Sequence, residues 1–184
     1  MLKGKNKRVI AVALSVLSVF GAMPTTSYAA SSTATVTFAY VYQSDGSQVC
    51  FQNTFQGTHG MDGHAGNTKP ALRIYANGAE AYCIEPGERL NTGDALTANA
   101  SDTWNNLGSA KQNAIKMALA LGKAGNANAL PGSADSKYLA TQMIIWEFVC
   151  GYRSTSGNYD RTDAQVYNAY CEGGANTEVA SAYN

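Results

Sequence analysis

Long hydrophobic runs are missing from this 184-residue sequence. The longest, from Val9 to Phe20, has about twelve residues, fewer than the roughly eighteen that a membrane-spanning helix requires. Internal repeats, heptads and low-complexity tracts are missing too. The mature chain is therefore not expected to insert into a membrane or to form a coiled coil or a repeat array.

Positive charge is also scarce. Four of the 13 Lys and Arg residues lie in the first 29 residues, which leaves nine against 13 Asp and Glu, a formal charge of −4. Proteins that bind nucleic acid concentrate positive charge on one face. Nucleic acid is therefore not an expected partner.

Residues 1–29 have the three parts of a secretory signal peptide. A basic start precedes the apolar run, and Ser27-Tyr28-Ala29 precedes the expected cleavage site. We therefore expect an exported, extracellular protein. Residues 30–184 are expected to form a single domain, because a chain of this length supports one hydrophobic core.

Four cysteines, Cys50, Cys83, Cys150 and Cys171, need an explanation in an exported chain. Thiols oxidise outside the cell, so two disulfides are one interpretation. If Cys83 is committed to another reaction, three cysteines remain, which allows one bridge and one free thiol. Cys150 with Cys171 is then the favoured pair.

Two hairpins are expected in the first half of the chain. Residues 34–42 alternate in hydrophobicity, turn at Asp45-Gly46 and return over residues 47–53. Residues 54–69 are rich in glycine, contain both histidines and are expected to be a loop. Asp62 lies between His59 and His64, but a loop offers no rigid ligand pairs, so no metal site is expected.

The second hairpin allows its register to be counted. Residues 71–76 and 79–84 flank Asn77-Gly78, the preferred two-residue turn. This register places six residues on one face, which we expect to face the core: Leu72, Ile74, Ala76, Ala79, Ala81 and Cys83. Cys83 should therefore point inward, and Pro86-Gly87 should end the strand.

Helices are expected in the second half, at residues 109–122 and 135–150, with a short turn around Trp104. Two capping boxes, Ser109 with Gln112 and Thr162 with Gln165, are expected to open the first of these helices and a later short one. Residues 122–132 are expected to be a loop. Apolar residues surround most of the 135–150 helix, which should be buried. Gln142 lies on it, and a buried amide without partners costs about 1–3 kcal/mol, so it needs hydrogen bonds or a chemical role.

Two short motifs resemble those of the thioester domains of Gram-positive surface adhesins. They are Tyr82-Cys83 on a strand and Thr141-Gln142-Met143-Ile144-Ile145-Trp146 on a helix, and the resemblance extends over about residues 34–172. It implies an α+β fold in which a β-barrel or sandwich subdomain packs on a small helical subdomain. The thioester would join the two.

The resemblance also implies a function. The Cys83 sulfur would displace ammonia from Gln142, and the thioester would then react with a lysine amine of a host protein such as fibrinogen or fibronectin. The event is single-turnover, so the protein is not expected to be an enzyme, and it would need no cofactor and act as a monomer. No cell-wall sorting motif precedes Asn184, so attachment to the cell wall is expected only from the resemblance.

Neither group reacts unaided, because a cysteine with a pKa near 8.5 is mostly thiol at neutral pH and a primary amide is a poor electrophile. A base and an oxyanion donor are therefore required. Glu85, Thr141 and the backbone N–H groups near Cys83 are the candidates. Tyr82 and Trp146 are expected to exclude water.

Two other functions remain open. A secreted cysteine hydrolase or transglutaminase would use Cys83 as nucleophile and His59 or His64 as base. A disulfide-stapled binding module would instead pair Cys83 with another cysteine and leave Gln142 merely buried. The eleven tyrosines would suit such a binder.

Overall fold

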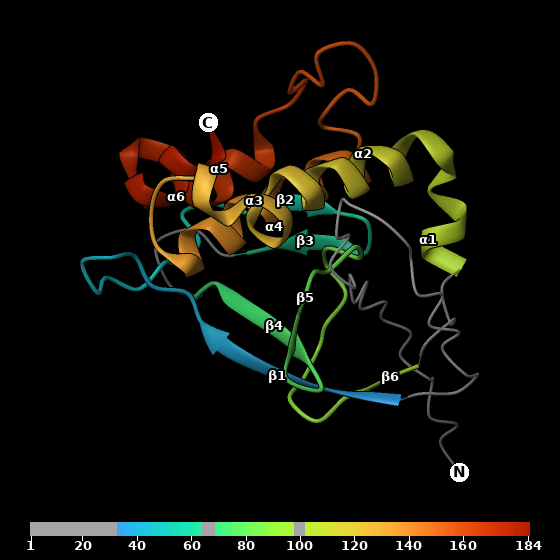
Figure 1. The fold of residues 1–184 in the computed structure, drawn as a ribbon, viewed down its shortest axis with the longest axis horizontal. Helices are drawn as coiled ribbons and strands as arrows, with labels where there is room; N and C mark the ends of the chain where they lie inside the picture. Colours follow the sequence, from blue (N-terminus) through green and yellow to red (C-terminus); the bar gives the residue numbers. More distant parts are fainter. Residues whose placement is uncertain (1–32, 64–68, 98–101) are drawn as a thin grey trace.

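The computed structural model describes residues 33–63, 69–97 and 102–184, so the expected signal peptide and His64 lie outside the described residues. Strands occupy the first half of the chain and helices the second. The helices form a layer over one side of the main sheet (Figure 1). The predicted α+β class, a β-barrel or sandwich packed on a helical part, is confirmed, and the β part is a curled four-stranded half-barrel sheet.

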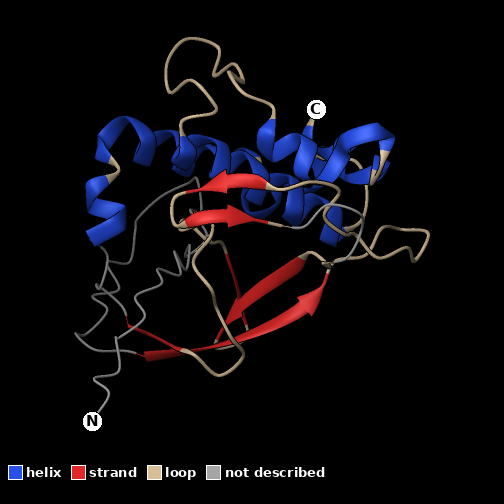
Figure 2. Cartoon of the chain, turned by 180° about the vertical axis from the view of Figure 1, so that it is seen from behind, coloured by secondary structure: helices blue, strands red, loops and turns tan. Residues whose placement is uncertain are grey.

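The main sheet has four antiparallel strands in the order β5-β4-β1-β6. They are β1 Thr33–Tyr40, β4 Leu72–Ala76, β5 Ala79–Ala81 and β6 Ala95–Thr97. Seen from behind, a separate two-stranded hairpin lies between this sheet and the helices (Figure 2). It consists of β2 Phe55–Gly57 and β3 Gly60–Asp62.

The predicted register of the second hairpin is confirmed as far as Ala81, with Ala76 opposite Ala79 and Ile74 opposite Ala81. Asn77 and Gly78 both have positive φ, as the tight turn requires. The ladder ends at Ala81, so Leu72 and Cys83 are not a strand pair, and Leu72 is exposed. Cys83 is nevertheless buried, because the chain turns into the helical layer beyond β5.

The first hairpin is confirmed only next to its turn. The chain reverses at Asp45-Gly46, Tyr42 pairs with Gln48, and the Val49 N–H donates to the Val41 carbonyl at 2.9 Å. The expected strand over residues 47–53 is wrong, because beyond this pairing the segment forms only an isolated bridge, Cys50 with Pro70. The long partner of β1 is instead β4. Local alternation could not reveal this, because pairing with a strand thirty residues away depends on the tertiary fold.

The expected loop at residues 54–69 contains the β2–β3 hairpin. Its glycines allow backbones to touch: a Cβ on Gly57 would lie 2.4 Å from the Pro86 carbonyl oxygen. Close backbone contact replaces the packing of aliphatic side chains. The hydrophobic pattern that predicts a strand is therefore absent here.

The helices are α1 Asp102–Asn106, α2 Gly108–Leu121, α3 Lys123–Asn126, α4 Ala134–Cys150, α5 Gln165–Cys171 and α6 Thr177–Tyr183, with short 3₁₀ turns η1 Ala127–Ala129 and η2 Glu172–Gly174. The predictions of α1, α2, α4 and α5 are confirmed. The expected loop at 122–132 contains α3 and η1, and α6 was not predicted.

Both predicted capping boxes are wrong. Neither α2 nor α5 has a side-chain cap at its N-cap residue, and the Gln112 amide instead donates to the Trp104 carbonyl, at 2.7 Å. The helix that is capped is α4, where the Ser133 hydroxyl accepts from the Ser136 N–H. Gly151, with φ of 82°, ends α4.

Helix α4 lies at the centre of the molecule and is buried on most of its circumference, as predicted. Its side chains pack against the segment that follows β5, and the helix contacts α2, α3, α5 and α6. Within the described part of the chain, no helix has both the length and the apolar character to cross a membrane.

Candidate functional site

Cys83 lies two residues beyond β5, in a stretch where every residue from Ala81 to Pro86 is buried. The β2–β3 hairpin fixes this stretch: the His59 N–H donates to the Pro86 carbonyl at 3.1 Å. Gly87, with φ of +92°, lies so close to the hairpin that a Cβ would be 3.0 Å from the Gly60 nitrogen. The cysteine is therefore held on a rigid backbone.

Gln142 comes from the middle of α4 and is 2% exposed. Its carboxamide makes two reciprocal hydrogen bonds with the backbone of Cys83. The Cys83 N–H donates to Oε1 at 2.7 Å, and Nε2 donates to the Cys83 carbonyl at 2.8 Å. The carboxamide is thus anchored on the same residue that carries the thiol.

These two bonds orient the amide for attack. The Cys83 N–H points at the oxygen on which negative charge develops if the amide carbon is attacked, which is the position of an oxyanion donor. This is one of the backbone N–H groups considered from the sequence. The bond from Nε2 fixes the rotation of the amide, so the leaving nitrogen has one defined position.

The Cys83 sulfur is enclosed. Burial raises the pKa of this thiol to about 12, although the Glu85 N–H, which donates to Sγ at 3.3 Å, and the neighbouring Trp146 indole both act to lower it. The Trp146 N–H has no hydrogen-bond partner by geometry, yet it is near enough to favour the thiolate. At neutral pH the group is therefore a thiol and needs a base.

Glu85 is 5% exposed and lies on the same cleft wall as Cys83. Its Oε1 accepts from the Thr103 hydroxyl of α1 and lies 3.7 Å from His59 Nε2. Its Oε2 is buried and has no hydrogen-bond partner. A buried carboxylate oxygen without a partner is costly, which makes it unusual in a folded protein.

A cleft of about 480 Å³ opens beside Cys83, Gln142 and Trp146. Its wall is apolar at several places, with Met61 and Leu72 largely exposed. Charged residues also line it: Asp62, Lys69, Glu85, Glu88 and Arg89. The cleft gives a small amine or a lysine side chain a route to Cys83 and Gln142.

Two of the predicted supporting residues face elsewhere. Tyr82 stacks on Tyr138, with ring centroids 4.8 Å apart, and its hydroxyl donates to Glu80. The Thr141 hydroxyl donates to the Lys137 carbonyl and accepts from the Lys123 N–H at 3.0 Å. Thr141 therefore joins α3 to α4, and neither side chain is in position to assist chemistry at Cys83.

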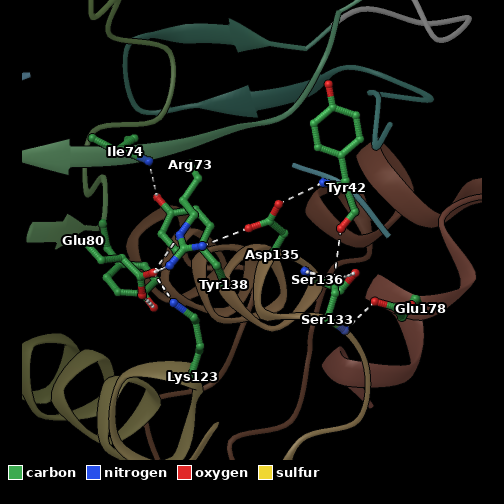
Figure 3. Close-up of polar contacts among 11 residues, drawn as sticks. Tyr42, Arg73, Ile74, Glu80, Lys123, Ser133, Asp135, Ser136, Tyr138 and Glu178 are labelled. Carbon is green, nitrogen blue, oxygen red and sulfur yellow. Dashed lines mark hydrogen bonds and ion pairs between the residues drawn. The ribbon is translucent and has the colours of Figure 1, made fainter. Parts of the chain in front are cut away.

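Tyr82 contacts instead a charged cluster around Glu80, whose carboxylate accepts from the Tyr82 hydroxyl. Figure 3 shows this cluster. Glu80 accepts from Arg73, Lys123 and the Tyr82 hydroxyl, and Arg73 also reaches Asp135, at 2.9 Å. The cluster links β4 and β5 to α3 and α4. It therefore helps to set the distance between Cys83 and Gln142.

Tyr138, which is fully buried, also positions the site. Its hydroxyl donates to the Ala81 carbonyl at 2.8 Å and accepts from the Ile74 N–H at 3.2 Å. Tyr138 lies one helical turn before Gln142, so one turn of α4 holds β5 and the next reaches Cys83. In the sequence, the four-residue spacing between Tyr138 and Gln142 places both on one face of the helix and could have indicated this role.

All four cysteines are free thiols, so the expected bridge between Cys150 and Cys171 is not present. Cys150 ends α4, and burial raises the pKa of its thiol, while Lys111 acts to lower that pKa and Asp62 to raise it. Cys171 ends α5, and burial raises the pKa of its thiol while Arg161 acts to lower it. The two thiols thus have different charged neighbours. Among the described residues, no group of three or more His, Cys, Asp and Glu side chains could hold a metal.

The comparison with protein families agrees with this geometry. A family model, the thioester domain, matches residues 80–176, more than half of the chain and a range that includes Cys83 and Gln142. The chain belongs to the thioester domain family. Thioester domains carry internal thioester chemistry, form covalent bonds in a single turnover and occur in surface proteins. No curated protein and no solved structure matched.

Proposed function

We propose that Cys83 and Gln142 of this thioester domain form the internal thioester, and that the protein uses it as a covalent adhesin against a lysine amine of a host protein. The observation that carries the proposal is the reciprocal pair of hydrogen bonds between the Gln142 carboxamide and the Cys83 backbone. Well-oriented intramolecular reactions reach effective molarities of roughly 10⁵ to 10⁸ M, enough to offset the low reactivity of an amide.

The chemistry balances in two steps. In the first, the Cys83 sulfur bonds to the Gln142 amide carbon, the carbon–nitrogen bond breaks, and ammonia leaves with the thiol proton. In the second, a lysine amine bonds to the same carbon and the Cys83 thiol is released. The product is an isopeptide bond, and Gln142 is consumed, so each molecule reacts once.

Intact-mass measurement tests the first step. The wild-type protein is expected to weigh one ammonia less than its sequence, and Cys83→Ala and Gln142→Ala are expected to have their full sequence mass. Matched controls are Cys50→Ala, which removes a different thiol, and Gln48→Ala, which removes an exposed glutamine; both should keep the deficit. A wild-type mass equal to that of the sequence would refute the thioester.

Methylamine and then host proteins test the second step. Methylamine should add to the wild type and to neither site variant. Incubation with fibrinogen or fibronectin should give a conjugate that survives denaturation. Peptide sequencing of this conjugate should show Gln142 joined to a lysine of the partner. Methylamine addition without either conjugate would retain the thioester and overturn this choice of partner.

The cysteine hydrolase is less well supported. His59 contacts the carboxylates of Glu85 and Glu88, at 3.7 and 4.0 Å, and among the described residues no histidine is hydrogen-bonded to the Cys83 sulfur. A hydrolase would show no ammonia deficit and would turn over repeatedly. The disulfide-stapled binder would lose hydrogens in pairs, and the four free thiols do not support it.

A further inference from the structure

Two buried side-chain atoms stand out within the described residues because they have no hydrogen-bond partner. They are Glu85 Oε2 and Trp146 Nε1, and both residues line the cleft that contains Cys83 and Gln142. Elsewhere in the described part of the chain, buried polar side-chain atoms are paired. Unpaired buried groups are expensive and concentrate where chemistry requires them.

The position of Glu85 relative to the sulfur is set by the backbone. Its own N–H donates to Cys83 Sγ at 3.3 Å, and its negative charge acts on the Cys83 thiol. The thiol is protonated at neutral pH because burial raises its pKa. Thioester formation therefore needs a proton acceptor inside the closed site.

The other carboxylate oxygen is already occupied. The Thr103 hydroxyl donates to Oε1, and His59 approaches the same oxygen. Both contacts are made to Oε1, so no other group donates a hydrogen bond to Oε2. Oε2 is thus a buried acceptor that has no partner until a proton reaches it.

We propose that Glu85 is the catalytic proton carrier of the thioester reaction, with Oε2 as the working oxygen and Thr103 and His59 as positioning residues. This inference rests on the proposed Cys83–Gln142 thioester. Oε2 takes the thiol proton as sulfur attacks the amide carbon. It then returns that proton to the leaving nitrogen, so ammonia departs and Glu85 is again a carboxylate.

The same oxygen serves the reverse sequence during capture of the target. Oε2 takes a proton from the attacking lysine amine and delivers it to the departing Cys83 sulfur. A lysine that enters as an ammonium ion first gives one proton to solvent, and the attack of the neutral amine then needs no further reactant. The buried negative charge also favours entry of a cationic lysine over a neutral side chain.

The first reaction is measured by refolding. The protein is isolated in the unfolded state, in which the Gln142 amide is intact, and is then allowed to fold. Ammonia release and the mass deficit are followed with time, and circular dichroism confirms folding. Glu85→Gln keeps the size and the Thr103 contact but cannot accept a proton, so formation should slow by about 100-fold or more. Glu172→Gln, which changes an exposed carboxylate away from the cleft in the same way, is the matched control and should form the thioester at the wild-type rate.

Chemical rescue separates catalysis from a structural role. Acetate or formate should restore part of the formation rate to Glu85→Ala, because a small carboxylate can occupy the vacated space, and should not accelerate the wild type. Thr103→Val leaves Glu85 in place but frees Oε1, and it should slow formation several-fold with an unchanged circular dichroism spectrum.

Two results would overturn the inference in distinguishable ways. If the wild type releases ammonia and Glu85→Gln does so at the same rate, the proton carrier is wrong and the thioester stands. If the wild type releases none, the proposed thioester is itself wrong. If Glu85→Gln does not fold, the rate of thioester formation in Thr103→Val is the test. A rate equal to that of the wild type would then contradict the proposal.

Discussion

The segment from Glu80 to Glu85 has two sides, and their polar groups are treated in opposite ways. On one side the Tyr82 hydroxyl donates to Glu80. The Glu80 carboxylate also accepts from Arg73 and Lys123 (Figure 3). On the other side Cys83 and Glu85 line a cleft together with Trp146, and the buried atoms Glu85 Oε2 and Trp146 Nε1 have no hydrogen-bond partner.

The difference separates two tasks. The paired cluster contributes to stability and fixes β5 against α4, whereas the cleft leaves polar atoms free to interact with groups that change during a reaction. Substitutions in the cluster should therefore lower the free energy of unfolding. Substitutions at Glu85 should instead slow thioester formation with little loss of stability.

The largest loss of stability is expected for Glu80→Ala. It leaves Lys123 without its carboxylate and Arg73 with only Asp135. Breaking a buried ion pair costs about 3–5 kcal/mol, and these side chains keep 14–18% exposure, so we expect about 3 kcal/mol by urea unfolding. Glu172→Ala removes an exposed carboxylate and should change stability by less than about 0.5 kcal/mol. Equal losses for both variants would contradict the comparison.

Gly57→Ala should disturb the cleft side through the backbone. Its Cβ would lie 2.4 Å from the Pro86 oxygen, so the segment after Cys83 must shift, at a cost of about 1–3 kcal/mol. The fraction of molecules with the ammonia deficit should fall as well. Gly46→Ala, with φ of +83° and open space around it, should cost about 1 kcal/mol of strain and keep the deficit. Intact mass and urea unfolding of both variants check this.

Tyr138→Phe removes the hydroxyl that joins the Ala81 carbonyl and the Ile74 N–H to α4. Leaving such buried groups unpaired should cost about 1–2 kcal/mol in thermal or urea unfolding. Tyr152→Phe removes an exposed hydroxyl, which donates to the Gln56 carbonyl, and should cost about 0.5 kcal/mol. A larger effect for Tyr152→Phe would show that the β5 contact is not important for stability.

The smallest effect concerns Glu178, at the end of the network drawn in Figure 3. Partial burial opposes the shift, but the Ser133 and Ser44 backbone N–H groups lower the pKa of Glu178 to about 2, from an ordinary 4.5. Its carboxylate therefore stabilises the fold above about pH 4.5, and this contribution disappears as pH falls toward 2. Unfolding measured across this range should be less pH-dependent in Glu178→Gln than in the wild type.

Local signals predicted the parts of the site that depend on neighbours in sequence. Asn77-Gly78 set the β4–β5 register, and the apolar circumference of α4 predicted that Gln142 is buried. The inward position of Cys83 followed, although the ladder stops at Ala81. These features needed only turn geometry and periodicity.

Contacts between distant segments could not be predicted in this way. Gly57 against Pro86, Thr103 on Glu85 and the free thiols of Cys150 and Cys171 all depend on how elements pack. Tyr82 and Thr141 match the residue types of the family motifs, but their side chains face away from Cys83. A motif gives the residue types, and packing gives their directions.

By itself, the sequence determined that an inward-facing cysteine after a hairpin and a glutamine on a buried helix belong to an α+β fold. Only the tertiary structure decided that the Gln142 carboxamide bonds to the Cys83 backbone and that Glu85 keeps one oxygen unpaired. Register and periodicity are properties of a few consecutive residues, whereas these contacts join residues up to 59 positions apart, and only packing of the whole chain fixes them.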